Sequence, residues 1–310
     1  MTSIVFGGGV YDGRFNTDMT HDSNELFRAF AVSGMQPEPR HVLMIGLASG
    51  SWAQVIANTP NVEDLTIVEI NPGYLSLIRK HPEVASVLTN PRGHVVIDDG
   101  RRWMVGHPER RFDLIVMNTT FNWRASISNL LSTEFLQLAH GHLNPGGIFY
   151  YNTTWSDRVF ATGIKVFPFA MRVSSFIALS NRPLVLDKAR WRDALVNFRI
   201  DGRPVFDLND PAQKARLEAV LHLADEMDLP GGNLESRATL GNRVRNARPL
   251  TDDNMGTEWE QLEQFRNTRR LLSAVKGGFF LRKKPLECVL SVYTNSETAI
   301  GSARRHDAVR

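Results

Sequence analysis

The chain has 310 residues, of which 42% are hydrophobic, so it can bury a full core as one large domain or as one domain with an appendage. Its formal net charge of +3 is too small to argue for nucleic acid, because binders of polyanions concentrate a basic excess on one face. The single cysteine, Cys288, excludes an internal disulfide framework. With no signal sequence and no apolar run near the ~20 residues of a membrane span, we expect a soluble, cytoplasmic chain.

The first elements are short. Residues 4–6 and 10–11 are apolar and are separated by a run of glycines, which predicts a small β-hairpin within residues 1–20. Residues 25–35 repeat apolar side chains at helical spacing behind the capping candidate Asp22, and prolines follow. We therefore predict one helix there.

A strand, a glycine turn, a helix and a second strand are predicted between His41 and Asn71. Apolar residues 42–45 lead into the sequence Gly-Leu-Ala-Ser-Gly of residues 46–50, where two glycines allow a tight turn and a close approach to a ligand. The second strand carries Glu69 near its end, roughly 20 residues after the turn, the spacing at which a βαβ unit places an acid on a ribose. This stretch predicts a nucleoside-binding half-site.

Three further predicted strands end in polar residues. Residues 95–97 lead into Asp-Asp-Gly, residues 112–117 into Asn-Thr-Thr, and residues 148–151 into a second Asn-Thr-Thr. Helices after residue 72 and over residues 133–142 and 159–167, followed by a strand over residues 174–179, continue the alternation. The order predicts an α/β fold with a doubly wound, mostly parallel, Rossmann-like sheet that binds ligands at the carboxyl ends of its strands.

The pattern changes after residue 185. Helices are predicted over residues 191–198, 212–227 and 259–275, with a glycine- and arginine-rich loop over residues 230–249. We therefore divide the chain into an N-terminal hairpin (1–20), a Rossmann-like domain (21–185), a helical extension with a loop that packs on it (186–275), and a partly flexible C-terminal segment (276–310).

Taken in order, these motifs resemble the spermidine synthase family of the class I S-adenosylmethionine-dependent methyltransferase superfamily, whose sheet has seven strands. The resemblance covers about residues 1–185. It is greatest to the spermidine synthase-like domains that bacteria fuse behind membrane segments, whose pattern includes stretches similar to residues 11–16 and 251–254. It implies S-adenosylmethionine or its decarboxylated form as co-substrate and no metal, and it leaves open whether a longer, membrane-fused protein contains this chain.

The resemblance also implies roles for two acids. Glu69 would accept hydrogen bonds from the ribose hydroxyls, and Asp99 would meet the adenine amino group; a carboxylate suits both tasks because it accepts several donors. The alternative is that these strand-end acids only cap the helices that follow them. The residues expected around the co-substrate are Gly46, Leu47, Ser49, Gly50, Glu69, Ile70, Asp98, Asp99, Gly100, Asn118 and Thr119.

Three carboxylates of the family pattern are missing. Spermidine synthases carry an Asp in the glycine turn that holds the ammonium of the decarboxylated co-substrate, and this chain has Ser49 there. Two acids that orient, deprotonate and contact the attacking amine are replaced by Asn118 and Phe121. Because an amide does not titrate near neutral pH and an alkylammonium has a pKa of about 10, the usual diamine is poorly served.

A neutral acceptor pocket is expected in their place. Asn118 and Asn152 follow neighbouring strands and should stand side by side, with Tyr150 or Tyr151, Trp123 and Trp155 as aromatic walls that suit a cation. The alternative is that the amides form turns and the aromatic rings pack in the core. The candidate catalytic residues are Ser49, Asn118, Tyr151 and Asn152.

Further charged groups could complete the pocket. Asp252 and Asp253 would restore negative charge if their loop folds over the site, and otherwise they belong to a solvated loop. Arg14, Arg101 and Arg124 are the candidates for a carboxylate, which S-adenosylmethionine has and its decarboxylated form lacks. The sequence does not choose among them.

We expect an enzyme that transfers an alkyl group, aminopropyl or aminocarboxypropyl, from the sulfonium to an amine other than the usual diamine. Methyl transfer is an alternative because it requires mainly a positioned nucleophile. The others are an acceptor-free cyclisation that releases methylthioadenosine, and a non-catalytic nucleoside-binding module. The expected partners are small molecules, with no nucleic acid and no membrane, and a homodimer is one option.

Overall fold

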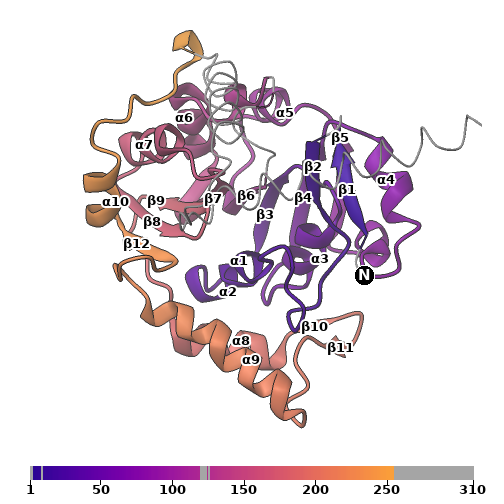
Figure 1. The fold of residues 1–310 in the computed structure, drawn as a ribbon. Helices are drawn as coiled ribbons and strands as arrows, with labels where there is room; N and C mark the ends of the chain where they lie inside the picture. Colours follow the sequence, from indigo (N-terminus) through magenta and orange to yellow (C-terminus); the bar gives the residue numbers. More distant parts are fainter. Residues whose placement is uncertain (1–2, 8–9, 119–123, 125, 255–310) are drawn as a thin grey trace, which may run out of the picture. The chain divides into compact units, whose positions relative to one another are not determined.

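The computed structural model describes residues 3–7, 10–118, 124 and 126–254 (Figure 1). The chain divides into two compact units, residues 1–259 and residues 260–310, and all described residues belong to the first. The predicted helix over residues 259–275 lies outside the described residues, as do the predicted site residues Thr119, Phe121 and Trp123.

An eight-stranded, mostly parallel sheet forms the centre of this unit. The strand order is β12-β8-β9-β7-β6-β3-β4-β5. The five strands from β7 to β5 are parallel, whereas β9, β8 and β12 each pair antiparallel with the strand before them in this sequence of neighbours. The chain order reverses between β3 and β6, and doubly wound sheets bind ligands at such a switch point. The strands are β3 (His41–Ile45), β4 (Asp64–Glu69), β5 (Gly93–Ile97), β6 (Phe112–Met117), β7 (Leu143–Asn152), β8 (Phe169–Val173), β9 (Phe176–Ser180) and β12 (Leu234–Ser236).

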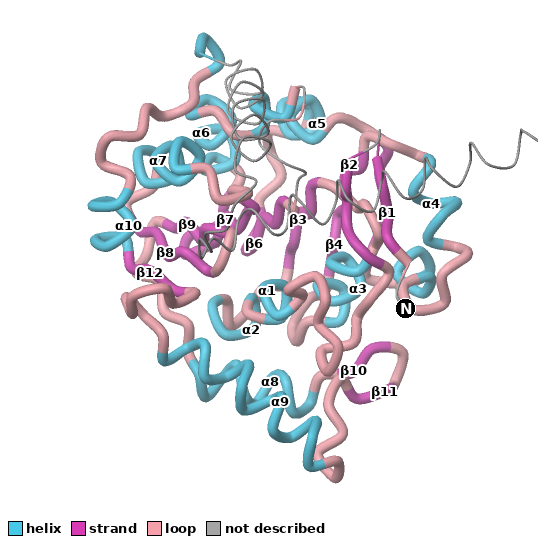
Figure 2. Tube along the Cα trace, viewed as in Figure 1, coloured by secondary structure: helices cyan, strands magenta, loops and turns pink. Residues whose placement is uncertain are grey.

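Helices cover both faces of the sheet, and side chains alternate between two cores. Val42 and Met44 of β3 pack into one core, and Leu43 and Ile45 pack into the other. Figure 2 shows α1, α2 and α3 on one side and α5, α6 and α7 on the other. The first core also includes residues of α4, α8 and α9, and the second includes α10.

Ten α-helices lie within the described residues. They are α1 (Phe27–Phe30), α2 (Val32–Met35), α3 (Ser51–Asn58), α4 (Gly73–Ile78), α5 (Gly100–Gly106), α6 (Thr133–Gly141), α7 (Asp157–Val166), α8 (Lys188–Asn197), α9 (Pro211–His222) and α10 (Arg237–Arg243), with the 3₁₀ turns η1 (Ala85–Thr89), η2 (Ile127–Leu130), η3 (Leu223–Asp225) and η4 (Asp252–Asn254). Within the described residues, no helix is long and apolar enough to cross a membrane.

The predicted fold class is confirmed, with differences in three places. The sheet has one strand more than predicted, because β12 and α10 arise within the predicted loop over residues 230–249. Residues 169–180 form two strands rather than one, since Ser174 adopts a positive φ of 55° and turns the chain. The single helix predicted before β3 is two short helices, α1 and α2. The Ser33 hydroxyl donates to the Phe30 carbonyl at 2.7 Å, a back-bond that competes with the helical ladder.

The N-terminal hairpin is tied to the first turn of α3. Its strands are β1 (Ile4–Gly7) and β2 (Val10–Arg14); a second small hairpin, β10 (Arg199–Ile200) with β11 (Arg203–Pro204), lies apart from the main sheet. The Ser51 hydroxyl donates to the Arg14 carbonyl at 2.6 Å and accepts from the Asn16 N–H at 3.1 Å. These bonds hold the end of β2 beside the glycine turn that precedes α3.

Candidate active site

The loops that follow β3, β4, β5, β6 and β7 meet at one edge of the sheet, which we call the ligand edge. Each predicted site residue except Tyr151 lies in or next to one of these loops, or, for Thr119, outside the described residues. The parallel register explains this, because it aligns the carboxyl ends of all five strands.

The glycine turn after β3 is tight and packs closely on its neighbours. Gly46 and Gly50 have φ of 90° and 79°, in the region that favours glycine. A Cβ on Gly46 would lie 3.6 Å from the Asn118 carbonyl oxygen, so the turn runs beside the start of the loop after β6. Ala48 has a φ of 47°, an uncommon conformation for a residue with a side chain.

Replacing Ala48 by glycine is expected to raise the free energy of unfolding by about 1 kcal/mol, because a left-handed conformation costs an L-residue roughly that much. Urea denaturation measures the change. Ala215→Gly, at an exposed position within α9, makes the same chemical change where the backbone is helical and should lower stability by about 1 kcal/mol. An equal loss of stability in both variants would contradict the left-handed conformation of Ala48 in the turn.

Glu69 joins the glycine turn to the loop after β4. Its side chain is buried, and one oxygen accepts the Leu47 N–H at 2.6 Å and the Ala48 N–H at 3.4 Å, while the other accepts the Asn71 N–H at 2.7 Å. A carboxylate offers about four acceptor positions, and the long bond to Ala48 is weak. The carboxylate therefore has acceptor positions left for the predicted hydrogen bonds from ribose hydroxyls, and this contact stays a prediction.

The carboxylates of Asp98 and Asp99 accept hydrogen bonds from a residue at the start of α5. Asp99 caps the helix by accepting the Arg102 N–H at 2.8 Å, and Asp98 accepts the Arg102 Nε–H at 2.6 Å. The capping alternative therefore describes Asp99 in this structure, and a bond to adenine would use its second oxygen. A Cβ on Gly100 would meet Ile45 at 2.6 Å, so glycine is required where α5 packs on the end of β3.

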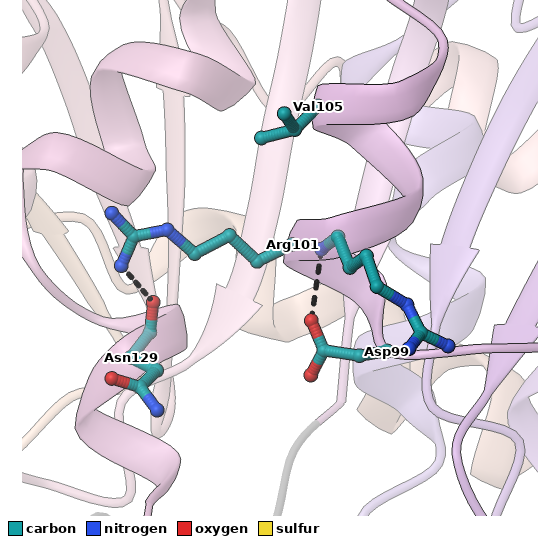
Figure 3. A pocket seen from close by; sticks show the side chains of 5 residues that line it. Asp99, Arg101, Val105 and Asn129 are labelled. Carbon is teal, nitrogen blue, oxygen red and sulfur yellow. Dashed lines mark hydrogen bonds between the residues drawn. The ribbon is translucent and has the colours of Figure 1, made fainter.

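An open depression of about 400 Å³ lies beside Asp99. Figure 3 shows Asp99, Arg101, Val105 and Asn129 around it, with the Arg101 guanidinium donating to the Asn129 carbonyl at 3.1 Å. Two large apolar side chains lie exposed at the ends of adjacent strands: Ile70 follows β4 and is 68% exposed, and Ile97 ends β5 and is 44% exposed. Exposed apolar groups at the ends of strands suit packing against a planar nucleobase, and Ile97 was not among the predicted site residues.

The two strand-end amides contact each other as predicted. The Asn152 Nδ2 donates to the Asn118 Oδ1 at 3.3 Å across the adjacent strands β6 and β7. The Asn152 Oδ1 in turn accepts the Thr154 N–H at 2.9 Å, within a turn where Thr154 and Trp155 both have positive φ. Trp155 is 46% exposed, and the buried Arg172 guanidinium lies 5.5 Å from its ring centroid. Of the predicted aromatic walls within the described part of the chain, Trp155 is the one with an exposed ring.

Tyr151 requires a correction. It is fully buried, and its hydroxyl donates to the Val159 carbonyl at 3.2 Å. Tyr150 is also fully buried and donates to the Arg28 carbonyl at 3.1 Å. Because β7 is covered on both faces, the side chains of Tyr150 and Tyr151 point into the two cores and not toward the ligand edge. Burial raises the pKa of both hydroxyls, so neither provides proton transfer at the edge.

Residues 251–254 dock on the starts of α5 and α6, but Asp252 brings no uncompensated charge. Both of its oxygens accept from the Arg101 guanidinium, one of them at 2.9 Å, and Glu134 accepts its N–H at 2.9 Å. The Arg101 hydrogen bond lowers the pKa of Asp252. Asp253 is exposed. Arg101 is thereby engaged by protein and is no longer a candidate partner for a ligand carboxylate.

A buried acid that the sequence analysis left without a role lies above the turn. Asp12, on β2, has a side chain only 8% exposed; it accepts from the Tyr74 hydroxyl of α4 and from the Arg124 guanidinium, whose Nη1 lies 3.3 and 3.4 Å from its two oxygens. Burial, and next the bond to Asp12, raises the pKa of the Tyr74 hydroxyl. A Cβ on Gly7 would overlap this pair, so the hairpin packs directly on it.

Ser49 lies under the same hairpin. It is 5% exposed, and its hydroxyl donates to the Ser51 hydroxyl at 3.2 Å. A Cβ on Gly13 would lie 3.2 Å from the Ser49 oxygen, so the residue after Asp12 touches the serine that replaces the family's turn acid. Within the described part of the chain, no group of three or more His, Cys, Asp or Glu side chains is arranged to hold a metal ion.

The strand order, the glycine turn and the acid after the second parallel strand define a protein with the class I methyltransferase-like fold. Residues 29–162 match the spermine/spermidine synthase domain, which confirms the predicted resemblance over that part of the chain.

Curated relatives carry the name polyamine aminopropyltransferase. The protein of Desulforudis audaxviator is 30% identical over 142 residues, covering 43% of this chain and 51% of its own length. That of Mycobacterium tuberculosis strain H37Rv is 30% identical over 172 residues, covering 51% and 33%, and that of Shigella flexneri is 35% identical over 112 residues, covering 36% and 38%. The matched region thus spans between about a third and a half of these relatives.

Solved spermidine synthases share the fold. The enzyme from Thermotoga maritima is 19% identical, with a TM-score of 0.50, over 72% of this chain and 84% of its own. A spermidine synthase in complex with the transition state analogue AdoDATO is 18% identical, with a TM-score of 0.52, over 72% and 85%. At this identity the likeness concerns the fold.

Proposed function

We propose that this chain is a transferase that moves an alkyl group from an adenosyl sulfonium to an amine other than the usual diamine. The observation that carries the proposal is a contrast at the ligand edge. Two carboxylates, buried Glu69 and half-buried Asp99, stand where the resemblance puts the nucleoside. A hydrogen-bonded pair of neutral amides, Asn118 and Asn152, stands where it puts the amine. The relatives named polyamine aminopropyltransferases and the shared fold support this class of reaction.

The reaction balances without a cofactor. The lone pair of the acceptor nitrogen attacks the carbon bonded to the sulfonium, a C–N bond forms, the C–S bond breaks, and the sulfur keeps its electron pair in neutral methylthioadenosine. The acceptor nitrogen then releases one proton to water. The edge contributes position and orientation, which can supply several orders of magnitude in rate.

The amide pair restricts the acceptor. Amides donate and accept hydrogen bonds but do not take up a proton near neutral pH. The acceptor must therefore reach the edge already uncharged, which favours a weakly basic amine over an alkyl diamine whose two ammonium groups have pKa values of about 10. The exposed face of Trp155 offers it an apolar surface beside the amides.

Product analysis tests the proposal. The full chain is incubated with S-adenosylmethionine or its decarboxylated form, with and without weakly basic amines and alkyl diamines, and the nucleoside product is identified. We expect methylthioadenosine that requires an amine and forms faster with weak bases. S-adenosylhomocysteine would instead indicate methyl transfer, and methylthioadenosine without any amine would indicate cyclisation. If no product forms and neither sulfonium compound raises the melting temperature, both the proposed enzyme activity and the nucleoside-binding site are contradicted.

A further inference from the structure

Asp12 and Arg124 form an ion pair between two parts of the chain that are distant in sequence. Asp12 comes from the hairpin, which touches the glycine turn through Gly13, and Arg124 comes from the segment between β6 and η2. Tyr74, from the helix after Glu69, donates to the same carboxylate. The pair therefore lies between the hairpin that touches the glycine turn and the helix that follows the nucleoside acid.

The structure distinguishes the three arginines that the sequence left open. Arg101 is held by both oxygens of Asp252 and by the Asn129 carbonyl. Arg14 has a buried Nε without a hydrogen-bond partner. Arg124 reaches Asp12 through one nitrogen at 3.3 and 3.4 Å, distances longer than those of a strong charge-assisted bond, and it is 33% exposed. Of the three arginines, Arg124 is thus the one whose weakly held negative partner, Asp12, a ligand carboxylate could replace.

We propose that Asp12 and Arg124 together bind the zwitterionic end of S-adenosylmethionine, with the ammonium on Asp12 and the carboxylate on Arg124. This rests on the function proposed above and specifies its donor: the group transferred is aminocarboxypropyl. The charges balance, because one partly buried ion pair is exchanged for two ion pairs with a zwitterion.

The decarboxylated form fits this arrangement less well. Its arm carries only an ammonium, which would pair with Asp12 and leave Arg124 without its carboxylate in a partly buried position. In the family pattern an Asp at the position of Ser49 serves that ammonium. Here the acid comes from the hairpin, one residue from the glycine that contacts Ser49, and it brings an arginine with it.

Calorimetric titration of the full chain with three ligands tests the inference: S-adenosylmethionine, its decarboxylated form, and methylthioadenosine, which lacks both the ammonium and the carboxylate. We expect S-adenosylmethionine to bind at least about 10-fold more tightly than the decarboxylated form, since a charge-assisted bond is worth about that factor or more. Arg124→Gln should lower the affinity for S-adenosylmethionine by about 10- to 100-fold and change that for methylthioadenosine by less than about 3-fold. It should raise the affinity for the decarboxylated form, which no longer leaves an arginine unpaired. Methylthioadenosine thus reports whether the variant is folded.

Matched variants identify the residue. Arg192→Gln removes an arginine of the same kind from the exposed pair with Glu218 on α8 and α9, and should leave all three affinities unchanged. The inference is overturned if the wild type prefers the decarboxylated form, if Arg124→Gln weakens all three ligands equally, or if Arg14→Gln alone discriminates against S-adenosylmethionine. If neither sulfonium and no methylthioadenosine binds to the wild type, the proposed function fails as well.

Discussion

Glu69→Gln is expected to lower the affinity for methylthioadenosine and for both sulfonium forms by about 100-fold, and to lower the free energy of unfolding by about 2 kcal/mol. The carboxylate accepts three backbone N–H groups, from Leu47, Ala48 and Asn71. A glutamine of the same shape replaces one acceptor oxygen by an NH₂ group, which would face an N–H and leave it unsatisfied in a buried position. The ribose would also lose a charged acceptor.

Titration calorimetry and urea denaturation measure the two effects separately. Glu63→Gln makes the same change on an exposed side chain at the start of β4, and should alter neither quantity beyond about 0.5 kcal/mol. A Glu69→Gln variant that is less stable but binds methylthioadenosine like the wild type would mean that Glu69 only braces the glycine turn. In that case the predicted nucleoside contact is wrong.

The parallel core of the fold could be predicted because its signals are local. Each parallel strand is a short apolar run, and the turn after β3 needs glycine at Gly46 and Gly50, where φ is positive. The predicted meeting of Asn118 and Asn152 followed from strand order alone, because neighbouring parallel strands end at the same edge. Such predictions require topology but no knowledge of side-chain packing.

The predictions that were wrong have a common cause. At these positions the structure is determined by contacts between residues that are distant in the sequence. β12 has three residues and exists because it pairs with β8 at the edge of the sheet, so no periodic pattern marks it. Tyr151 comes directly before Asn152, the last residue of β7, but successive side chains alternate in direction and that of Tyr151 is directed into the core. A position near a strand end was therefore not sufficient to place a side chain at the ligand edge.

Asp12 could not be given a role from the sequence for the same reason. Its partners Tyr74 and Arg124 lie 62 and 112 residues away in the chain, so no spacing rule connects them. The available signal was a charged residue between the apolar Tyr11 and a glycine in a predicted hairpin. What identifies Asp12 is its low exposure together with a hydroxyl and a guanidinium that both point to it. The acids of the family pattern are missing from their positions, but the chain has a second carboxylate of low exposure besides Glu69, that of Asp12.

Asn118→Asp is expected to raise the rate of transfer to an alkyl diamine by about 100-fold, because a positioned general base contributes roughly that factor or more. The substitution fits the structure. Asn118 uses its oxygen to accept from the Asn152 amide at 3.3 Å, and a carboxylate oxygen would accept the same bond. The new charge would also attract a dicationic acceptor. Steady-state rates of methylthioadenosine formation, with saturating sulfonium and each amine in turn, measure the change.

Asn152→Asp is the matched control, because it adds the same charge to the neighbouring strand end. Asn152 already uses its oxygen to accept the Thr154 N–H at 2.9 Å, so a carboxylate there would be engaged by the turn and act more weakly as a base. A gain confined to Asn118→Asp would identify a lost base at that position as the main barrier to diamines. Equal gains in both variants would mean that added negative charge attracts the dication without positioned proton transfer. No gain in either variant would contradict the expectation and would show that the acceptor pocket differs from that of a spermidine synthase in more than its acids.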